Sequence, residues 1–243
     1  MAAPVHLPGL PIQNIEGLDA SRHSVLVRMT HWIFTLSFFG LVLSGIAIIL
    51  AHPRLYWGEA GAVGMPSLID LPVPFVRDIP IRGPGRYLHY FSAWTCVLTG
   101  LIYVFSGLLT QHFRRNLMPA HADFSWRSIS QVAFSHLRLK RPAEEDAQTY
   151  NVLQRLSYLA VVFLFLPLMI WTGLAMSPAI VSVFPFLVTS FGGQQSARTL
   201  HFFLAVVLVL FLFVHIAMVC LAGFALRTRA MITGHSAARK DRP

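Results

Sequence analysis

Residues 199–224 read Thr-Leu-His-Phe-Phe-Leu-Ala-Val-Val-Leu-Val-Leu-Phe-Leu-Phe-Val-His-Ile-Ala-Met-Val-Cys-Leu-Ala-Gly-Phe and decide the fold. Such an apolar run is long enough to cross a bilayer as a helix, which takes about 20 residues. It nevertheless contains His201 and His215, and an ionisable ring inside lipid costs free energy unless it has a partner. Their separation is close to four helical turns, so both rings project from nearly one face, roughly 21 Å apart along the axis. Two stacked metal sites fit this spacing.

The composition of the whole chain is that of a polytopic membrane protein. Hydrophobic residues make up 55% of the chain and charged residues only 12%, and the mean hydropathy is +0.61, which excludes an ordinary soluble domain. Four long stretches lack Asp, Glu, Lys and Arg, and they predict transmembrane helices over 30–51, 87–111, 154–177 and 199–224. The chain is therefore expected to form one all-α domain over 1–243, a membrane four-helix bundle with outer loops at 52–86 and 178–198 and an inner loop at 112–153.

The net charge of +9 is explained by topology, because the basic residues flank the spans and no nucleic-acid readout motif accompanies them. In a four-span arrangement most of them fall on one side: Arg22, Arg28, Arg114, Arg115, Arg127, Arg138, Lys140, Arg141, Arg155, Arg227, Arg229, Arg239, Lys240 and Arg242. The positive-inside rule makes this side the cytoplasm, with both termini there. The residues before the first span lack the pattern of a cleaved secretory signal, so that span is expected to be retained.

The loops and cysteines carry weaker signals. The first outer loop is rich in Gly and Pro, which should break regular elements, and its apolar side chains predict docking on the membrane surface or on a partner. The apolar surplus of the third stretch is expected to be a loop. In the inner loop, residues 125–138 fit an amphipathic interfacial helix as well as a simple basic connector. Cys96 and Cys220 lie in different spans without a Cys-x-x-Cys-His motif, which indicates small packing residues rather than a disulfide or covalent haem.

Depth in the membrane sorts the histidines into pairs. His31 begins the first span at the inner side and His89 begins the second at the outer side. The fourth span enters from outside, so His201 shares the outer level with His89, and His215 shares the inner level with His31. Five others lie in polar or terminal segments, where they are expected to be solvated: His6, His23, His121, His136 and His235.

Two histidine pairs, each from two helices, favour haem iron with an axial histidine on both faces. Structural zinc would want about four ligands, and each level offers two with no nearby Cys, Asp or Glu. Hydrogen-bonded helix packing is the simpler alternative. His52 competes for the outer level but precedes Pro53 at a span end, whereas His112 is out of phase with His89 and lies beside inner arginines.

Small and basic residues near these histidines fit the same interpretation. Space for a porphyrin, or ordinary close helix packing, explains Gly40, Ser44, Gly45, Gly100, Ser106 and Gly107. Arg28, Arg86 and Arg198 each precede a proposed ligand by three residues, where a guanidinium can pair with a haem propionate. Anchoring by the positive-inside rule explains Arg28 equally well.

Several segments together make the chain resemble the bacterial dihaem membrane cytochrome b family, which includes the cytochrome b561 proteins and the cytochrome b subunits of nickel-iron hydrogenases, formate dehydrogenases and thiosulfate reductases. The matching segments are Arg28-Met29-Thr30-His31-Trp32, His89, Tyr150-Asn151-Val152-Leu153-Gln154-Arg155-Leu156, Thr172-Gly173-Leu174-Ala175-Met176-Ser177-Pro178, and Arg198-Thr199-Leu200-His201 with His215. The thiosulfate reductase type is the most similar.

The resemblance implies two non-covalent b haems that carry electrons between a membrane quinone and a redox subunit on the outer, periplasmic face, such as a molybdopterin oxidoreductase. It implies the bacterial inner membrane as the location, an electron-transfer role within an oxidoreductase complex, and a quinone near the inner haem, where Asn151 and Gln154 match in position. Helix capping is the alternative role for Asn151, and Leu153 stands where a formate dehydrogenase relative has glycine. Two other functions remain open: a stand-alone cytochrome b561 such as a superoxide:quinone oxidoreductase, and a haem-free transporter or scaffold.

Overall fold

The structure is a computed structural model, and it describes residues 24–61, 64–72, 82–111, 156–221 and 223–234. Four helices in these ranges are long and apolar enough to cross a membrane: Val25–Ala51, Pro84–Leu109, Leu156–Ala175 and Gln194–Leu221. They correspond to the four expected spans and make the chain a multi-pass membrane protein with an all-α bundle. The predicted inner-loop helix at 125–138, His112, Asn151 and Gln154 lie outside the described residues.

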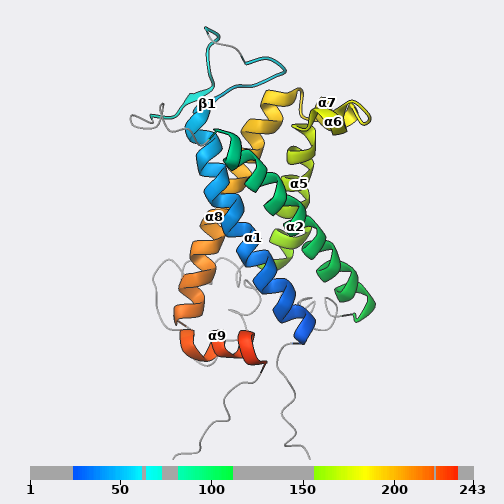
Figure 1. The fold of residues 1–243 in the computed structure, drawn as a ribbon, viewed down its shortest axis with the longest axis vertical. Helices are drawn as coiled ribbons and strands as arrows, with labels where there is room; N and C mark the ends of the chain where they lie inside the picture. The colour runs from blue at the N-terminus through cyan, green and yellow to red at the C-terminus, as the bar shows by residue number, and fades with distance from the viewer. Residues whose placement is uncertain (1–23, 62–63, 73–81, 112–155, 222, 235–243) are drawn as a thin grey trace, which may run out of the picture.

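The four spans pack most closely as two pairs. Helix α1 (Val25–Ala51) runs against α2 (Arg82–Leu109), and α5 (Leu166–Ala175) runs against α8 (Gln194–Leu221) (Figure 1). Gly40 allows the close approach of the first pair, because a Cβ there would lie 2.5 Å from the Ser92 hydroxyl oxygen. Close helix packing therefore explains Gly40 better than space for a ligand does.

The third span is not a uniform α-helix. Its middle, η4 (Val161–Phe165), is a π-helical turn that leads directly into α5, whose second residue is Pro167. Proline has no N–H and its ring crowds the carbonyl four residues earlier, so a local widening of the helix is the expected accommodation.

The outer loop docks on the start of α8. Two short antiparallel strands, β1 (Arg54–Leu55) and β2 (Ile69–Asp70), are closed by a 3.0 Å ion pair between Arg54 and Asp70. The Gly58 carbonyl accepts hydrogen bonds from the backbone N–H groups of Gln195 at 3.0 Å and Ser196 at 3.3 Å. This carbonyl satisfies N–H groups that have no partner within the helix. The loop is thus docked on α8 of its own chain, and docking on the membrane surface or on a partner stays a prediction. It also contains the small sheet, which the Gly and Pro content did not predict.

Two further short helices occupy the connection expected to be an apolar loop. They are α6 (Pro178–Val181) and α7 (Phe186–Thr189), and α8 then begins at Gln194 rather than at 199. Serine and proline at the start of α6 suit a helix N-terminus, because proline lacks the N–H that would have no partner there. The prediction of an apolar loop is therefore wrong in two respects: the connection contains two short helices, and it ends at residue 193 rather than 198.

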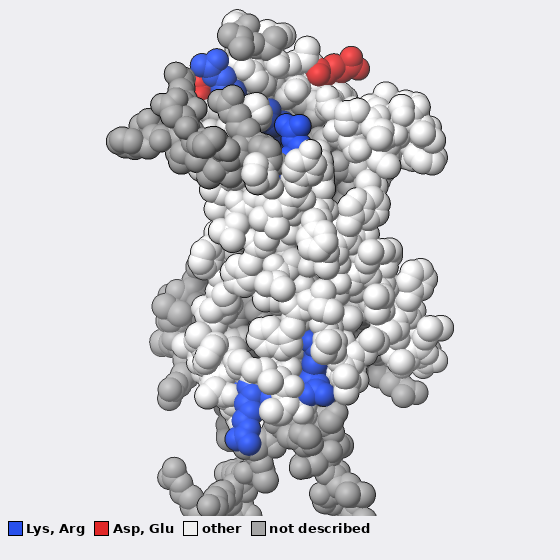
Figure 2. All heavy atoms as spheres, viewed as in Figure 1, with Lys and Arg blue, Asp and Glu red and all other residues white. Residues whose placement is uncertain are grey.

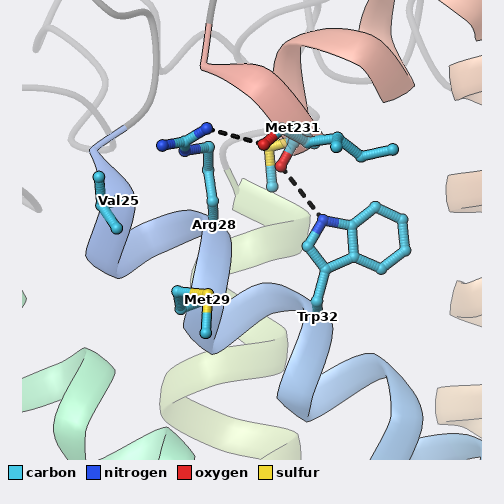
Figure 3. Close-up of a pocket in the computed structure, with 6 residues that line it drawn as sticks. Val25, Arg28, Met29, Trp32 and Met231 are labelled. Atoms are coloured by element: carbon cyan, nitrogen blue, oxygen red, sulfur yellow. Dashed lines mark hydrogen bonds between the residues drawn. The ribbon is translucent and has the colours of Figure 1, made fainter.

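At the opposite end, α9 (Phe224–Thr233) turns sharply away from α8, and its last turn lies near the start of α1 (Figure 1). Gly223 and Gly234 bracket it with backbone φ angles of 98° and 86°. Arg28 donates to the Ile232 carbonyl at 2.8 Å, and the Trp32 indole N–H donates to the Met231 carbonyl at 3.1 Å (Figure 3). These donors satisfy carbonyls of the last helical turn of α9.

Charges are confined to the two ends of the described molecule, with an uncharged band between them on the face shown in Figure 2. This distribution is what a bilayer requires, since charged side chains are expensive in hydrocarbon. The many large apolar side chains exposed along the spans agree with it, among them Leu36 at 76% and Phe91 at 73%. Cys96 is buried, as expected of a packing residue, whereas Cys220 is exposed on α8.

Candidate functional site

The two outer histidines meet across the bundle. His89 comes from α2 and His201 from α8, so each belongs to a different helix pair, and their ring centroids lie 6.3 Å apart with an interplanar angle of 62°. The sequence predicted that these residues share a level in the membrane, and the structure brings them together.

Each outer ring is held at its Nδ1 atom by a hydroxyl from the neighbouring helix of its own pair. The Ser44 hydroxyl on α1 lies 3.0 Å from His89 Nδ1, and the Thr172 hydroxyl on α5 lies 2.9 Å from His201 Nδ1. Both hydroxyl side chains are deeply buried, since Ser44 is 2% exposed and Thr172 is 1% exposed.

This geometry suits a single metal ion between the rings. A metal about 2 Å from each ligating nitrogen places two facing imidazole centroids about 6 Å apart, once the distance from nitrogen to ring centre is added. With Nδ1 of each ring engaged by a hydroxyl, Nε2 is the ring nitrogen that would bind a metal. Within the described ranges no three His, Cys, Asp or Glu side chains gather as a metal site, so the donor set is two imidazoles. Two axial imidazoles are a donor set of haem iron.

Glycines keep the space beside these rings clear. A Cβ at Gly173 would lie 3.5 Å from His201 Cε1, and one at Gly45 would lie 3.9 Å from His89 Cε1. A larger side chain at either position would reach the imidazole. Gly45 therefore fits the expected role of a small residue near a ligand.

The inner histidines have different surroundings. His215 lies beside Tyr158, whose hydroxyl is 3.4 Å from His215 Nδ1, and it stacks on Phe211 at 6.1 Å between centroids with an interplanar angle of 23°. His31 makes an edge contact with Trp32 at 5.3 Å. Both histidines lie toward the inner end, on α1 and α8, and their pairing remains a prediction.

The three arginines proposed for haem propionates occupy different positions. Arg28 donates to the Ile232 carbonyl of α9, and Arg198 donates through Nη2 to the His52 carbonyl at 2.6 Å. Arg86 is exposed in the first turns of α2. A guanidinium has five N–H donors, so one backbone contact leaves Arg28 and Arg198 with others.

His52 lies at the end of α1, outside the pair formed by His89 and His201. It is the exposed residue that ends α1, and it is its backbone that engages Arg198 and the last turn of α1. That His52 does not bind the outer metal stays a prediction.

A cavity of about 370 Å³ lies at the inner end between α1 and α9 (Figure 3). Its lining is apolar except for the arginine: Val25, Arg28, Met29, Trp32, Met231 and Ile232. The two hydrogen bonds from Arg28 and Trp32 to α9 close one of its walls.

The hydrogen bonds of these hydroxyls to the histidines were not predicted, and Ser44 was expected only as a small residue. A signal did exist for the third span, because Tyr158 and Thr172 have the same separation as His201 and His215. In two antiparallel helices this equal spacing places one hydroxyl at each histidine level. Serine and threonine are common in transmembrane helices, so the equal spacing stands out only once the helix pairing is known.

The chain is similar to one family of cytochromes and to a putative subunit of a reductase. A family model described as prokaryotic cytochrome b561 matches residues 22–234. A putative protein-methionine-sulfoxide reductase subunit, YedZ1 of Azospira oryzae, is 29% identical over 221 residues, which cover 88% of this chain and 96% of that protein. No solved structure matches the chain.

Proposed function

Because the chain belongs to the prokaryotic cytochrome b561 family, we propose that it binds two non-covalent b haems and transfers electrons between a membrane quinone and a periplasmic redox subunit. His89 and His201 are the outer axial ligands in this proposal, and His31 and His215 are the inner ones. The observation that carries it is the 6.3 Å approach of the two outer rings from separate helix pairs. Family membership itself implies b-type haem, and the number of haems is part of the proposal.

When bound, a b haem supplies one-electron exchange between ferric and ferrous iron. The chain supplies the imidazole ligands, the hydroxyls that orient them, and an apolar environment that sets the relative free energies of the ferric and ferrous states. No bond-making side chain is required. His201 and His215 lie roughly 21 Å apart along one helix axis, so they would hold two haems at two depths and give electrons a route across the membrane.

The quinone site is proposed at the inner level near His215. Asn151 and Gln154, which precede the third span, are its proposed polar contacts, since side-chain amides can hydrogen-bond to quinone oxygens. Oxidation of one quinol to quinone releases two electrons and two protons, and the electrons leave one at a time. The relative named as a reductase subunit supports flow from quinol towards an outer acceptor.

The acceptor is proposed to be a periplasmic molybdopterin oxidoreductase docked at the outer end. Exposed apolar side chains are available there for docking: Trp57 at 59%, Phe184 at 51% and Phe186 at 59%. Exposed apolar side chains of this kind mark partner or membrane contacts. The chain would then lie in the bacterial inner membrane with both termini in the cytoplasm, which places the arginine-bearing α9 on the positive inner side.

Arg86 and Arg198 are the proposed propionate partners of the outer haem, and Arg28 that of the inner haem. Each lies within one helical turn of a proposed ligand. A guanidinium pairs well with a carboxylate because two parallel N–H groups can bind its two oxygens.

The test is quinol-driven haem reduction in vesicles that contain the purified chain. A ubiquinol or menaquinol analogue should reduce both haems in the wild type, whereas His215→Ala should block reduction of the outer haem by quinol and leave its chemical reduction by dithionite intact. His52→Ala is the matched control, since it removes an exposed imidazole at a span end. Equal quinol reduction in the wild type and His215→Ala would contradict the proposed route.

A further inference from the structure

Two buried hydroxyl groups occupy equivalent places beside the outer histidines. Ser44 approaches His89 Nδ1 to 3.0 Å, and Thr172 approaches His201 Nδ1 to 2.9 Å. Each bridges a closely packed helix pair, from α1 to α2 in the first case and from α5 to α8 in the second. The outer site thus receives one histidine and one hydroxyl from each pair.

The hydrogen bonds of these hydroxyls to their own helices favour one direction of the contact with the histidine. A hydroxyl has one proton to donate and two lone pairs to accept with. The Ser44 hydroxyl lies 2.6 Å from the Gly40 carbonyl oxygen, and the Thr172 hydroxyl lies 2.9 Å from that of Leu168. A carbonyl can only accept, so we assign each hydroxyl proton to the carbonyl of its own helix. The hydroxyl oxygen then accepts, and the histidine Nδ1–H donates.

We propose that Ser44 and Thr172 are positioning residues that hold His89 and His201 in the tautomer with the proton on Nδ1 and the lone pair of Nε2 directed at the iron. The inference rests on the proposed function, because it assigns these residues to the outer haem. The second hydrogen-bond partner of a ligating histidine fixes its tautomer and ring orientation in this way.

The same contact tunes the haem. A hydrogen bond accepted from Nδ1–H makes the imidazole a stronger electron donor, which favours ferric over ferrous iron. Loss of the hydroxyl should therefore raise the midpoint potential of the outer haem. For a one-electron couple, a tenfold loss of preference for ferric iron corresponds to about 59 mV.

The test compares Thr172→Val and Ser44→Ala with the wild type in the purified full-length chain, by redox titration followed in the haem absorption bands. Both variants should raise the potential of the outer haem, and should weaken its retention by about tenfold or more, while the inner haem is unchanged. Thr172→Ser keeps a hydroxyl that can bond to the Leu168 carbonyl, so it should restore the wild-type potential.

Matched controls separate this role from general packing. Thr95 makes the same bond to the carbonyl four residues earlier, at 2.9 Å from Phe91, and Ser37 does so at 2.8 Å from Ile33. Ser37 is also buried, at 7% exposure. Thr95→Val and Ser37→Ala should leave the outer potential at its wild-type value.

Failure of this inference and failure of the proposed function give different results. Two haems in the wild type with unshifted outer potentials in both hydroxyl variants would overturn the positioning role alone. A haem-free wild type would overturn the proposed function, and the tautomer can then still be read from ¹⁵N spectra of histidine-labelled chain made without haem. A proton on Nδ1 of His89 and His201 supports the inference, whereas a proton on Nε2 overturns it.

Discussion

The outer and inner ends of the bundle hold their histidines by different means. At the outer end, each ring has a short hydrogen bond between its Nδ1 atom and a buried hydroxyl, at 3.0 and 2.9 Å. At the inner end, His215 has a longer 3.4 Å contact with the Tyr158 hydroxyl and stacks on Phe211. A hydrogen bond at a ring nitrogen restrains the tautomer and the orientation of the ring, whereas ring stacking mainly restrains its plane.

The segments that cover the two ends of the bundle, the outer loop and helix α9, are also held by different means. The outer loop is joined to α8 through backbone contacts between Gly58 and residues 195–196, and its Tyr56 carbonyl accepts a 2.6 Å hydrogen bond from buried Thr199. The inner helix α9 is held to α1 by two long side chains, Arg28 and Trp32. Backbone contacts tolerate little movement and flexible side chains tolerate more. Among the described residues, the outer loop is therefore held more firmly than α9.

The largest effect is expected from removal of one axial ligand at each level. His201→Ala should remove the outer haem and keep the inner one, and His215→Ala should do the reverse, because an iron held by two imidazoles loses one of them. Haem content and the redox-titration curve of each purified variant measure this. Loss of both haems, or of neither, in both variants would break the distinction between the levels.

The next effect concerns the loops. Gly193→Ala should destabilise the chain by about 1–3 kcal/mol, because its φ of 130° disfavours a side chain and a Cβ would run into the Gly58 backbone. Gly234→Ala should cost less, because its Cβ meets the movable end of Arg28 at 3.0 Å. Thermal unfolding in detergent measures both.

Gly192→Ala is the matched control for the outer loop, since its φ is also positive, at 71°, but nothing lies within 4 Å of the added Cβ. Equal destabilisation by Gly192→Ala and Gly193→Ala would show that backbone strain alone matters and that docking to Gly58 does not.

A smaller effect is expected at the inner hydroxyl. Tyr158→Phe should shift the inner haem potential less than Thr172→Val shifts the outer one, because a 3.4 Å contact is at the limit of a hydrogen bond. Redox titration of the two variants side by side gives both shifts. An inner shift as large as the outer one would remove the proposed difference in how the levels are held.

The smallest effect is expected from Trp32→Phe, which keeps the ring but loses the indole N–H that reaches Met231. A single hydrogen bond is worth about 1 kcal/mol, so α9 should loosen while both haems stay bound. Faster hydrogen exchange in residues 224–233, measured by mass spectrometry, would report this. Unchanged exchange there would mean that Arg28 alone holds the helix.

The spans were predictable from sequence because apolar runs of this length without a charged residue are typical of membrane helices and rare in soluble domains. The ends of the spans were less predictable, because two helices begin earlier than expected. Helix α1 begins at Val25, where the Ser24 hydroxyl accepts a hydrogen bond from Val27 N–H at 3.3 Å. Helix α2 begins at Arg82, with Pro84 in its first turn. Proline is tolerated in the first turn of a helix, so Pro84 belongs to the start of α2, although the Gly and Pro content there had predicted a loop. The start of α8 depends on the distant Gly58 carbonyl, which no local pattern can reveal.

The levels of the histidines were also predictable, since alternation of span direction assigns each one to an end of the bundle. The meeting of His89 and His201 agrees with that assignment. Ser44 and Thr172 could not be recognised from sequence, because their role depends on which helices pair and on the side to which each hydroxyl turns. The two pairs, α1 with α2 and α5 with α8, supply that information.

The most direct test of two histidine-bound haems, one at each end, is the haem content of the purified wild-type chain, by pyridine haemochrome assay and a reduced-minus-oxidised spectrum. We expect two b haems per chain, both low-spin and six-coordinate. A colourless chain, or one haem per chain with no second site on reconstitution, would contradict this arrangement.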